Sequence, residues 1–199
     1  MFDFTEFARS IYDKWPPAHE RPYLLPALYG GEPTMMYDAM FVLEAPSVPF
    51  TEDRWESCYS VEAAIRIHRK VFLVWASQGY CSILFRTFLT TPTDFFERVY
   101  VTDVWKDARA CEQKVGSSEY KSYWRSKLAI ELNSVPTQCV ITVGGVAQRE
   151  VGQLRRAGLI GEGLKIEHIG FPGGRRQGIT YESYGKDVAA LIEKIQTED

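Results

Sequence analysis

Four short apolar runs, separated by longer segments of helical periodicity, constrain the fold of this chain more than any other feature. The runs cover residues 40–43, 99–102, 139–143 and 165–169. They are on the whole continuous apolar runs, which are typical of parallel strands buried on both faces. We therefore expect an α/β protein, folded as a three-layer α/β/α sandwich with a short, mainly parallel, four-stranded central sheet.

The segments around these runs predict the helices that would cover the sheet. Apolar residues recur there at three- and four-residue spacing, as on the buried face of a helix. Helices are expected at residues 2–12, 61–79, 82–89, 120–132, 146–157 and 184–195. Because no repeat, low-complexity tract or linker interrupts the pattern, we expect a single domain spanning residues 1–199.

Composition excludes several classes of protein. Hydrophobic residues make up 45% and charged residues 25% of the chain, close to the globular average, which argues against global disorder. No apolar run approaches the roughly 18 residues of a membrane span, and the acidic N-terminus is unlike a signal peptide. We expect a cytoplasmic protein with no membrane association and no obligate protein partner.

The cysteines and histidines do not form a metal-binding pattern. No two of the four cysteines stand two or four residues apart, and the three histidines are isolated from one another. We expect reduced thiols, no metal and no cofactor. The cysteines are Cys58, Cys81, Cys111 and Cys139.

Charge is distributed unevenly along the chain. The net charge is −3, yet residues 140–180 contain six basic and three acidic side chains. A local basic region can bind phosphates on an acidic protein. A solvated surface is the alternative explanation for an excess of this size.

The loops that follow the four runs are the candidate site, because ligands of such sheets bind at the carboxyl ends of the strands. Glu44 follows the first run, where Pro46 would hold it rigidly beside a ligand; a solvated loop glutamate is the alternative. Asp103 closes the second run and could equally be a helix N-cap. Gly144 and Gly145 follow the third run, as a phosphate-binding turn or as a site of close strand-to-helix packing.

Taken together, these loops resemble the uracil-DNA glycosylase superfamily, and most closely its bacterial and archaeal branch with an N-terminal iron–sulfur cluster. Residues 43–47 (LEAPS) resemble the first motif, Gly-Glu-(Ala/Gly)-Pro-Gly, and residues 49–50 resemble the Pro-Phe pair that follows it. Residues 99–106 and 136–147 are similar to the second and third strands of that branch. Residues 171–176 (FPGGRR) resemble the second motif, His-Pro-Ser, with its DNA-penetrating loop.

The resemblance implies a DNA glycosylase that flips a base out of DNA and hydrolyses its glycosidic bond. Glu44 would stabilise the positive charge on the sugar and orient the water. Phe50 would stack on the base and Asp103 would read its edge. The implied substrate-binding residues are Ala45, Pro46, Ser47, Phe50 and Phe171, and the implied DNA-binding residues are Gly144, Gly173, Gly174, Arg175 and Arg176.

The sequence departs from the family at three places. The cluster cysteines are missing, with Asp107 near the position of one, so no iron–sulfur cluster is expected. Asp103 stands where the family has an asparagine, and Phe171 replaces the histidine of the second motif. Strand alternation predicts that His168 faces away from Phe171, as a partly buried strand histidine rather than a substitute.

These departures leave three hypotheses open. The first is a glycosylase for a non-standard base. An ionised Asp103 offers only acceptors, which favours the amino group of cytosine over O4 of uracil. Ordinary cytosine would be a lethal substrate, so a modified cytosine of the kind found in phage DNA is expected, and a protonated Asp103 would permit uracil instead. The second is a catalytically degenerate DNA-binding module, and the third an unrelated doubly wound enzyme that binds a nucleotide.

Overall fold

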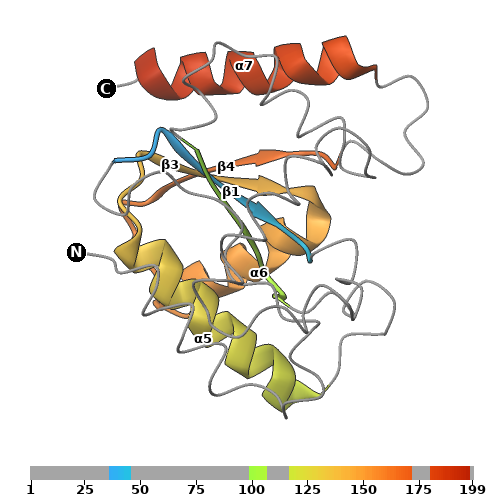
Figure 1. Ribbon diagram of the computed structural model, residues 1–199. Helices are drawn as coiled ribbons and strands as arrows, with labels where there is room; N and C mark the ends of the chain where they lie inside the picture. The colour runs from blue at the N-terminus through green and yellow to red at the C-terminus, as the bar shows by residue number, and fades with distance from the viewer. Residues whose placement is uncertain (1–35, 46–98, 107–116, 172–179, 198–199) are drawn as a thin grey trace, which may run out of the picture.

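The four apolar runs form one parallel sheet, with strand order β2-β1-β3-β4 (Figure 1). The computed structural model describes residues 36–45, 99–106, 117–171 and 180–197. All positions of the first three strands are buried, whereas those of the edge strand β4 are partly or fully exposed. Burial on both faces explains why the first three strands are mostly apolar, whereas β4 contains three polar residues. The strands are β1 (Ala39–Leu43), β2 (Val99–Asp103), β3 (Cys139–Val143) and β4 (Lys165–Ile169).

Three described helices cover the two faces of this sheet. Helices α5 (Ser118–Ser134) and α6 (Gly144–Arg156) pack on one face, and α7 (Tyr181–Thr197) packs on the other (Figure 1). Strand alternation divides the core accordingly: Val42 and Val140 belong to the α5–α6 side, and Phe41 and Ile141 to the α7 side. The predicted three-layer α/β/α architecture is confirmed, and the sheet is entirely parallel.

The predicted helix boundaries need small corrections. Helix α6 begins at Gly144, two residues earlier than predicted, because the two glycines form its first turn rather than a turn before it. Helices α5 and α7 each extend a turn or less beyond the predicted limits at both ends. The helices predicted at residues 2–12, 61–79 and 82–89 lie outside the described residues.

The strand order creates a topological switch point between β1 and β3. The chain passes from β1 to its neighbour β2 on one side, and from β3 to its neighbour β4 on the other. In open α/β sheets the crevice outside the carboxyl ends of two such strands is the usual place for a ligand. Here that crevice lies between the residues that follow Leu43 and those that follow Val143.

No helix in the described ranges is long and apolar enough to cross a membrane. Cys139 is buried with a free thiol, and burial raises the pKa of that thiol to about 11.

Candidate functional site

Glu44 lies at the switch point, immediately after β1. The chain after β2 continues the ladder alongside it: the Val104 amide donates to the Leu43 carbonyl at 2.8 Å, and the Trp105 amide donates to the Glu44 carbonyl at 3.0 Å. These bonds fix the backbone of Glu44, while its side chain is exposed. Glu44 thus has a fixed backbone and an exposed carboxylate at the carboxyl edge of the sheet.

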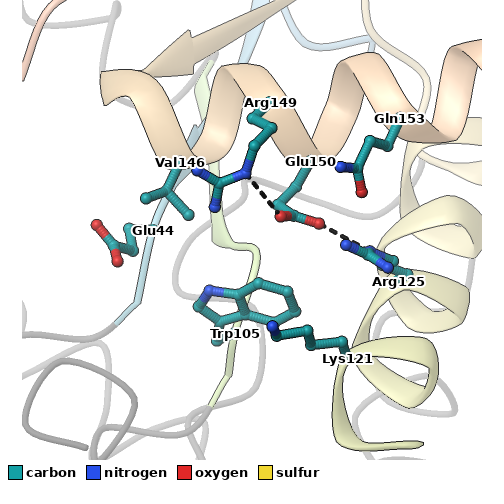
Figure 2. Close-up of a pocket in the computed structure, with 8 residues that line it drawn as sticks. All are labelled: Glu44, Trp105, Lys121, Arg125, Val146, Arg149, Glu150 and Gln153. Carbon is teal, nitrogen blue, oxygen red and sulfur yellow. Dashed lines mark hydrogen bonds and ion pairs between the residues drawn. The ribbon is translucent and has the colours of Figure 1, made fainter. Parts of the chain in front are cut away.

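A pocket of about 450 Å³ opens beside Glu44, between α5 and α6 (Figure 2). Its volume lies in the range of small-ligand sites, roughly 300–1,000 Å³. The pocket combines one strand-end carboxylate, one indole and a group of charged helix side chains. Its lining residues are Glu44, Trp105, Lys121, Arg125, Val146, Arg149, Glu150 and Gln153.

A buried carboxylate organises the helix side of this pocket. Glu150, only 3% exposed, accepts from Nε of Arg125 at 2.7 Å and from Nε of Arg149 at 3.2 Å. Figure 2 shows the two arginines approaching Glu150 from opposite sides, one from each helix. The three side chains therefore join α5 to α6 and hold both guanidinium groups at the pocket wall.

Asp103 lies one strand away from Glu44 but does not line the pocket. Asp103 is 2% exposed, and its Oδ2 atom has no hydrogen-bond partner among the described residues. Burial raises the pKa of Asp103 to about 7; Lys106 opposes this shift, and the charges of Glu131 and Glu44 add to it. A carboxyl group with this pKa exists in both protonation states near neutral pH.

A buried polar cluster supports the end of β2 from the α5 side. Lys106 forms an ion pair with Glu131 at 2.7 Å, contacts the Thr102 hydroxyl, and donates to the carbonyl of Asp103 at 3.1 Å. Glu131 also accepts from the Tyr100 hydroxyl at 2.8 Å. This cluster fixes the backbone of Asp103 and accounts for two of the charges that act on its carboxyl group.

Gly144 and Phe171 meet on the other side of the switch point. Gly144 has a φ of +83°, and a Cβ atom added there would lie 3.3 Å from Cβ of Phe171. Phe171 follows β4 and is 39% exposed. The positive φ and the closeness of Phe171 account for a glycine at this position. The N-cap residue of α6, Val143, makes no side-chain capping bond.

His168 is exposed, so the prediction of a partly buried histidine is wrong. His168 lies in β4, an edge strand in which every described position is at least partly exposed. Its Nδ1 atom lies 3.0 Å from the carbonyl oxygen of Thr142, on the neighbouring strand. Its ring is therefore tied to β3 instead of to a candidate site residue.

The predicted site residues divide into two groups. Glu44, Ala45, Asp103, Gly144 and Phe171 all lie at the carboxyl edge of the sheet, with Ala45 packed against the core on the α5–α6 side. The other predicted residues fall outside the described ranges. These are Pro46, Ser47, Phe50, Gly173, Gly174, Arg175 and Arg176.

Sequence reasoning missed the helix side of the pocket. Lys121 and Arg125 are four residues apart on α5, and Arg149 and Gln153 are four residues apart on α6, so each pair shares a helix face. This spacing was a usable signal for two polar faces. It did not show that the faces oppose each other, which depends on how α5 packs against α6.

Among the described residues, no group of three or more histidine, cysteine, aspartate or glutamate side chains could hold a metal ion. Comparisons of the sequence with models of known protein families and with curated proteins find no match.

Proposed function

We propose that this protein is a DNA glycosylase, a divergent member of the uracil-DNA glycosylase superfamily that excises a non-standard base. The observation that carries the proposal is the position of Glu44, a strand-end carboxylate that lines a pocket at the switch point of a parallel sheet. Gly144 and Phe171, from two other motifs of the resemblance, lie at the same edge.

Glu44 suits the chemistry of glycosidic hydrolysis. As the bond between C1′ and the base nitrogen breaks, its electron pair leaves with the base and positive charge develops on the sugar. A fixed carboxylate stabilises that charge, and it accepts a proton from the water that attacks C1′. Glu44 combines a backbone held by Trp105 with an exposed carboxylate, as this role requires.

Asp103 is proposed to read the edge of the base. Its Oδ2 atom, which is buried and outside the pocket lining, makes no hydrogen bond to the described residues, and its backbone is held by Lys106. In the ionised form it accepts from the amino group of cytosine, and we propose a modified cytosine, as in phage DNA, as the preferred substrate. Such an activity would serve antiviral defence.

Phe171 supports a second candidate, a DNA-binding module of the same fold without catalytic activity. A phenyl ring cannot donate a hydrogen bond to a departing base anion, as the histidine of the family's second motif would. Because Phe171, which follows β4 and is 39% exposed, stands in place of that histidine, this contribution to catalysis is missing.

A uracil-DNA glycosylase of base-excision repair is the third candidate. The raised pKa of Asp103 supports it, because a protonated carboxyl can donate a hydrogen bond to O4 of uracil.

The deciding experiment is base release from a panel of DNAs, detected by mass spectrometry. The panel contains uracil-substituted DNA, unmodified DNA and phage DNAs with modified cytosines. We expect release of a modified cytosine by the wild-type protein and none by Glu44→Gln. Binding without release of any base would favour the non-catalytic module, and release of uracil alone would favour the repair enzyme. Absence of DNA binding would overturn all three.

A further inference from the structure

The helix wall of the pocket beside Glu44 carries more basic side chains than acidic ones. Among the described residues that line the pocket, Lys121, Arg125 and Arg149 are basic, and Glu150 on the helix wall and Glu44 on the strand side are acidic. Glu150 is already engaged by the two arginines. Lys121 is half-buried, and its ammonium group has no hydrogen-bonded or ion-paired partner in the described part of the chain.

The two guanidinium groups are held in place before any ligand arrives. Each contacts the buried carboxylate of Glu150 through Nε, the inner nitrogen of the group. Figure 2 shows the Arg149 guanidinium above the Trp105 indole and the Lys121 ammonium beside that indole. Cations fixed in this way bind an anion at a smaller entropic cost than freely rotating ones.

The chemistry of this wall favours a phosphate group. Guanidinium groups present planar pairs of donors that match phosphate oxygens, and an ammonium adds a compact positive charge. The first turn of α6, which begins at Gly144, opens on the same edge and adds the positive end of a helix dipole. Val146 and the Trp105 indole are the apolar side chains among the described lining residues, and the other six are polar or charged.

We infer that this pocket binds a phosphate of the DNA backbone, with Lys121 supplying the free positive charge and Glu150 holding Arg125 and Arg149 in position. The identity of the occupant as DNA rests on the proposed function, since Glu44 lines the same pocket. A phosphate held here would place the neighbouring nucleotide beside the proposed catalytic carboxylate. Its residues differ from Arg175 and Arg176, which the sequence suggested for DNA binding and which lie outside the described residues.

The test compares two lysine substitutions. DNA affinity is measured at several salt concentrations for the wild type, Lys121→Ala and Lys186→Ala, with an undamaged single strand and its duplex as probes. Lys186 is exposed on α7, on the opposite face of the sheet, and serves as the matched control. We expect Lys121→Ala to weaken binding roughly tenfold and to lower the slope of log affinity against log salt by about one, with Lys186→Ala near wild type.

Two further measurements separate this inference from the proposed function. Inorganic phosphate is compared with chloride at equal ionic strength for its effect on the Tm of the wild type and of Lys121→Ala. Phosphate stabilisation lost in Lys121→Ala, with DNA binding unchanged, would identify a free phosphate compound as the occupant and overturn the inference. Equal salt slopes for both variants would also overturn it. A Lys121-dependent slope without release of any base would leave the phosphate site standing and reject the glycosylase.

Discussion

Lys106 and Glu131 form an ion pair of 2.7 Å, although their side chains are only 1% and 0% exposed. Both partners have further bonds: Glu131 accepts from Tyr100 and Thr102, and Lys106 donates to the carbonyl of Asp103. The pair therefore joins the chain just after β2 to α5 through charges that are buried from water. Such a pair is costly to break because the remaining charge stays buried.

Lys106→Met should destabilise the protein by about 3–5 kcal/mol, since it leaves the carboxylate of Glu131 buried without its cation. Urea denaturation of the purified protein measures this loss. Lys186→Met, which removes an exposed lysine from α7, is the control and should change the free energy of unfolding by less than about 0.5 kcal/mol. A loss below about 1 kcal/mol in Lys106→Met would contradict the importance of the buried pair.

Gly144→Ala should cost about 1–2 kcal/mol of stability. Two effects combine: a φ of +83° is unfavourable for alanine, and the new Cβ would lie 3.3 Å from Cβ of Phe171. Gly145→Ala is the matched control, because Gly145 lies in the same turn and a methyl group added there would meet no atom within 4 Å. Thermal unfolding of both variants decides the point, and equal Tm values would show that Gly144 is not constrained.

The strands and layers could be predicted from the sequence because a strand that is buried on both faces is a short, mostly apolar run of residues. A run such as residues 139–143 is apolar at all positions but Thr142, and the structure has a strand with these bounds. The start of α6 was predicted two residues late, because two consecutive glycines are read locally as a turn. Only the packing of Gly144 against Phe171 shows why a glycine begins this helix.

The pocket could not be predicted in the same way, because its wall is made by two helices that face each other. Lys121 and Arg149 lie 28 positions apart, and nothing local links them. Glu150 and Glu131 were equally inconspicuous as single acidic residues in helices. Their burial and their partners depend on the packing of α5 against α6 and against β2.

Glu44→Gln should lower the rate of base release by about a hundredfold or more and leave stability unchanged. The substitution keeps the volume of the side chain and removes the charge that stabilises the sugar cation. Because the carboxylate is exposed, its loss disturbs no buried contact, and the Tm should shift by less than a degree or so. Single-turnover base release measures the rate. Activity near that of the wild type would remove Glu44 from the mechanism.

The stability of the protein should depend on pH through Asp103. Its pKa of about 7 in the folded protein lies above its ordinary value of 3.8, mainly because of burial. Between these two values the folded protein binds more protons than the unfolded chain, so the free energy of unfolding falls as pH rises from about 4 to 8. Asp103→Asn removes this contribution, and its stability relative to the wild type should rise by about 2–4 kcal/mol over that range. A constant difference in urea denaturation would contradict the prediction.

The choice of base should also depend on the protonation of Asp103. The ionised carboxylate offers two acceptors and favours the amino group of a cytosine derivative. The protonated carboxyl offers one donor and one acceptor, as an asparagine amide does, and therefore matches O4 and N3–H of uracil. Since its pKa is about 7, both forms are present at neutral pH. Lowering the pH from 8 to 6 should then raise the ratio of uracil release to modified-cytosine release.

This ratio is measured on two duplexes that differ only in the target base, so that any effect of pH common to both reactions cancels. We expect the ratio to rise roughly tenfold to a hundredfold between pH 8 and pH 6, following the ratio of protonated to ionised Asp103. Asp103→Asn should favour uracil at every pH, because the amide offers the same donor and acceptor throughout. A ratio in the wild type that does not change with pH would show that Asp103 does not read the base.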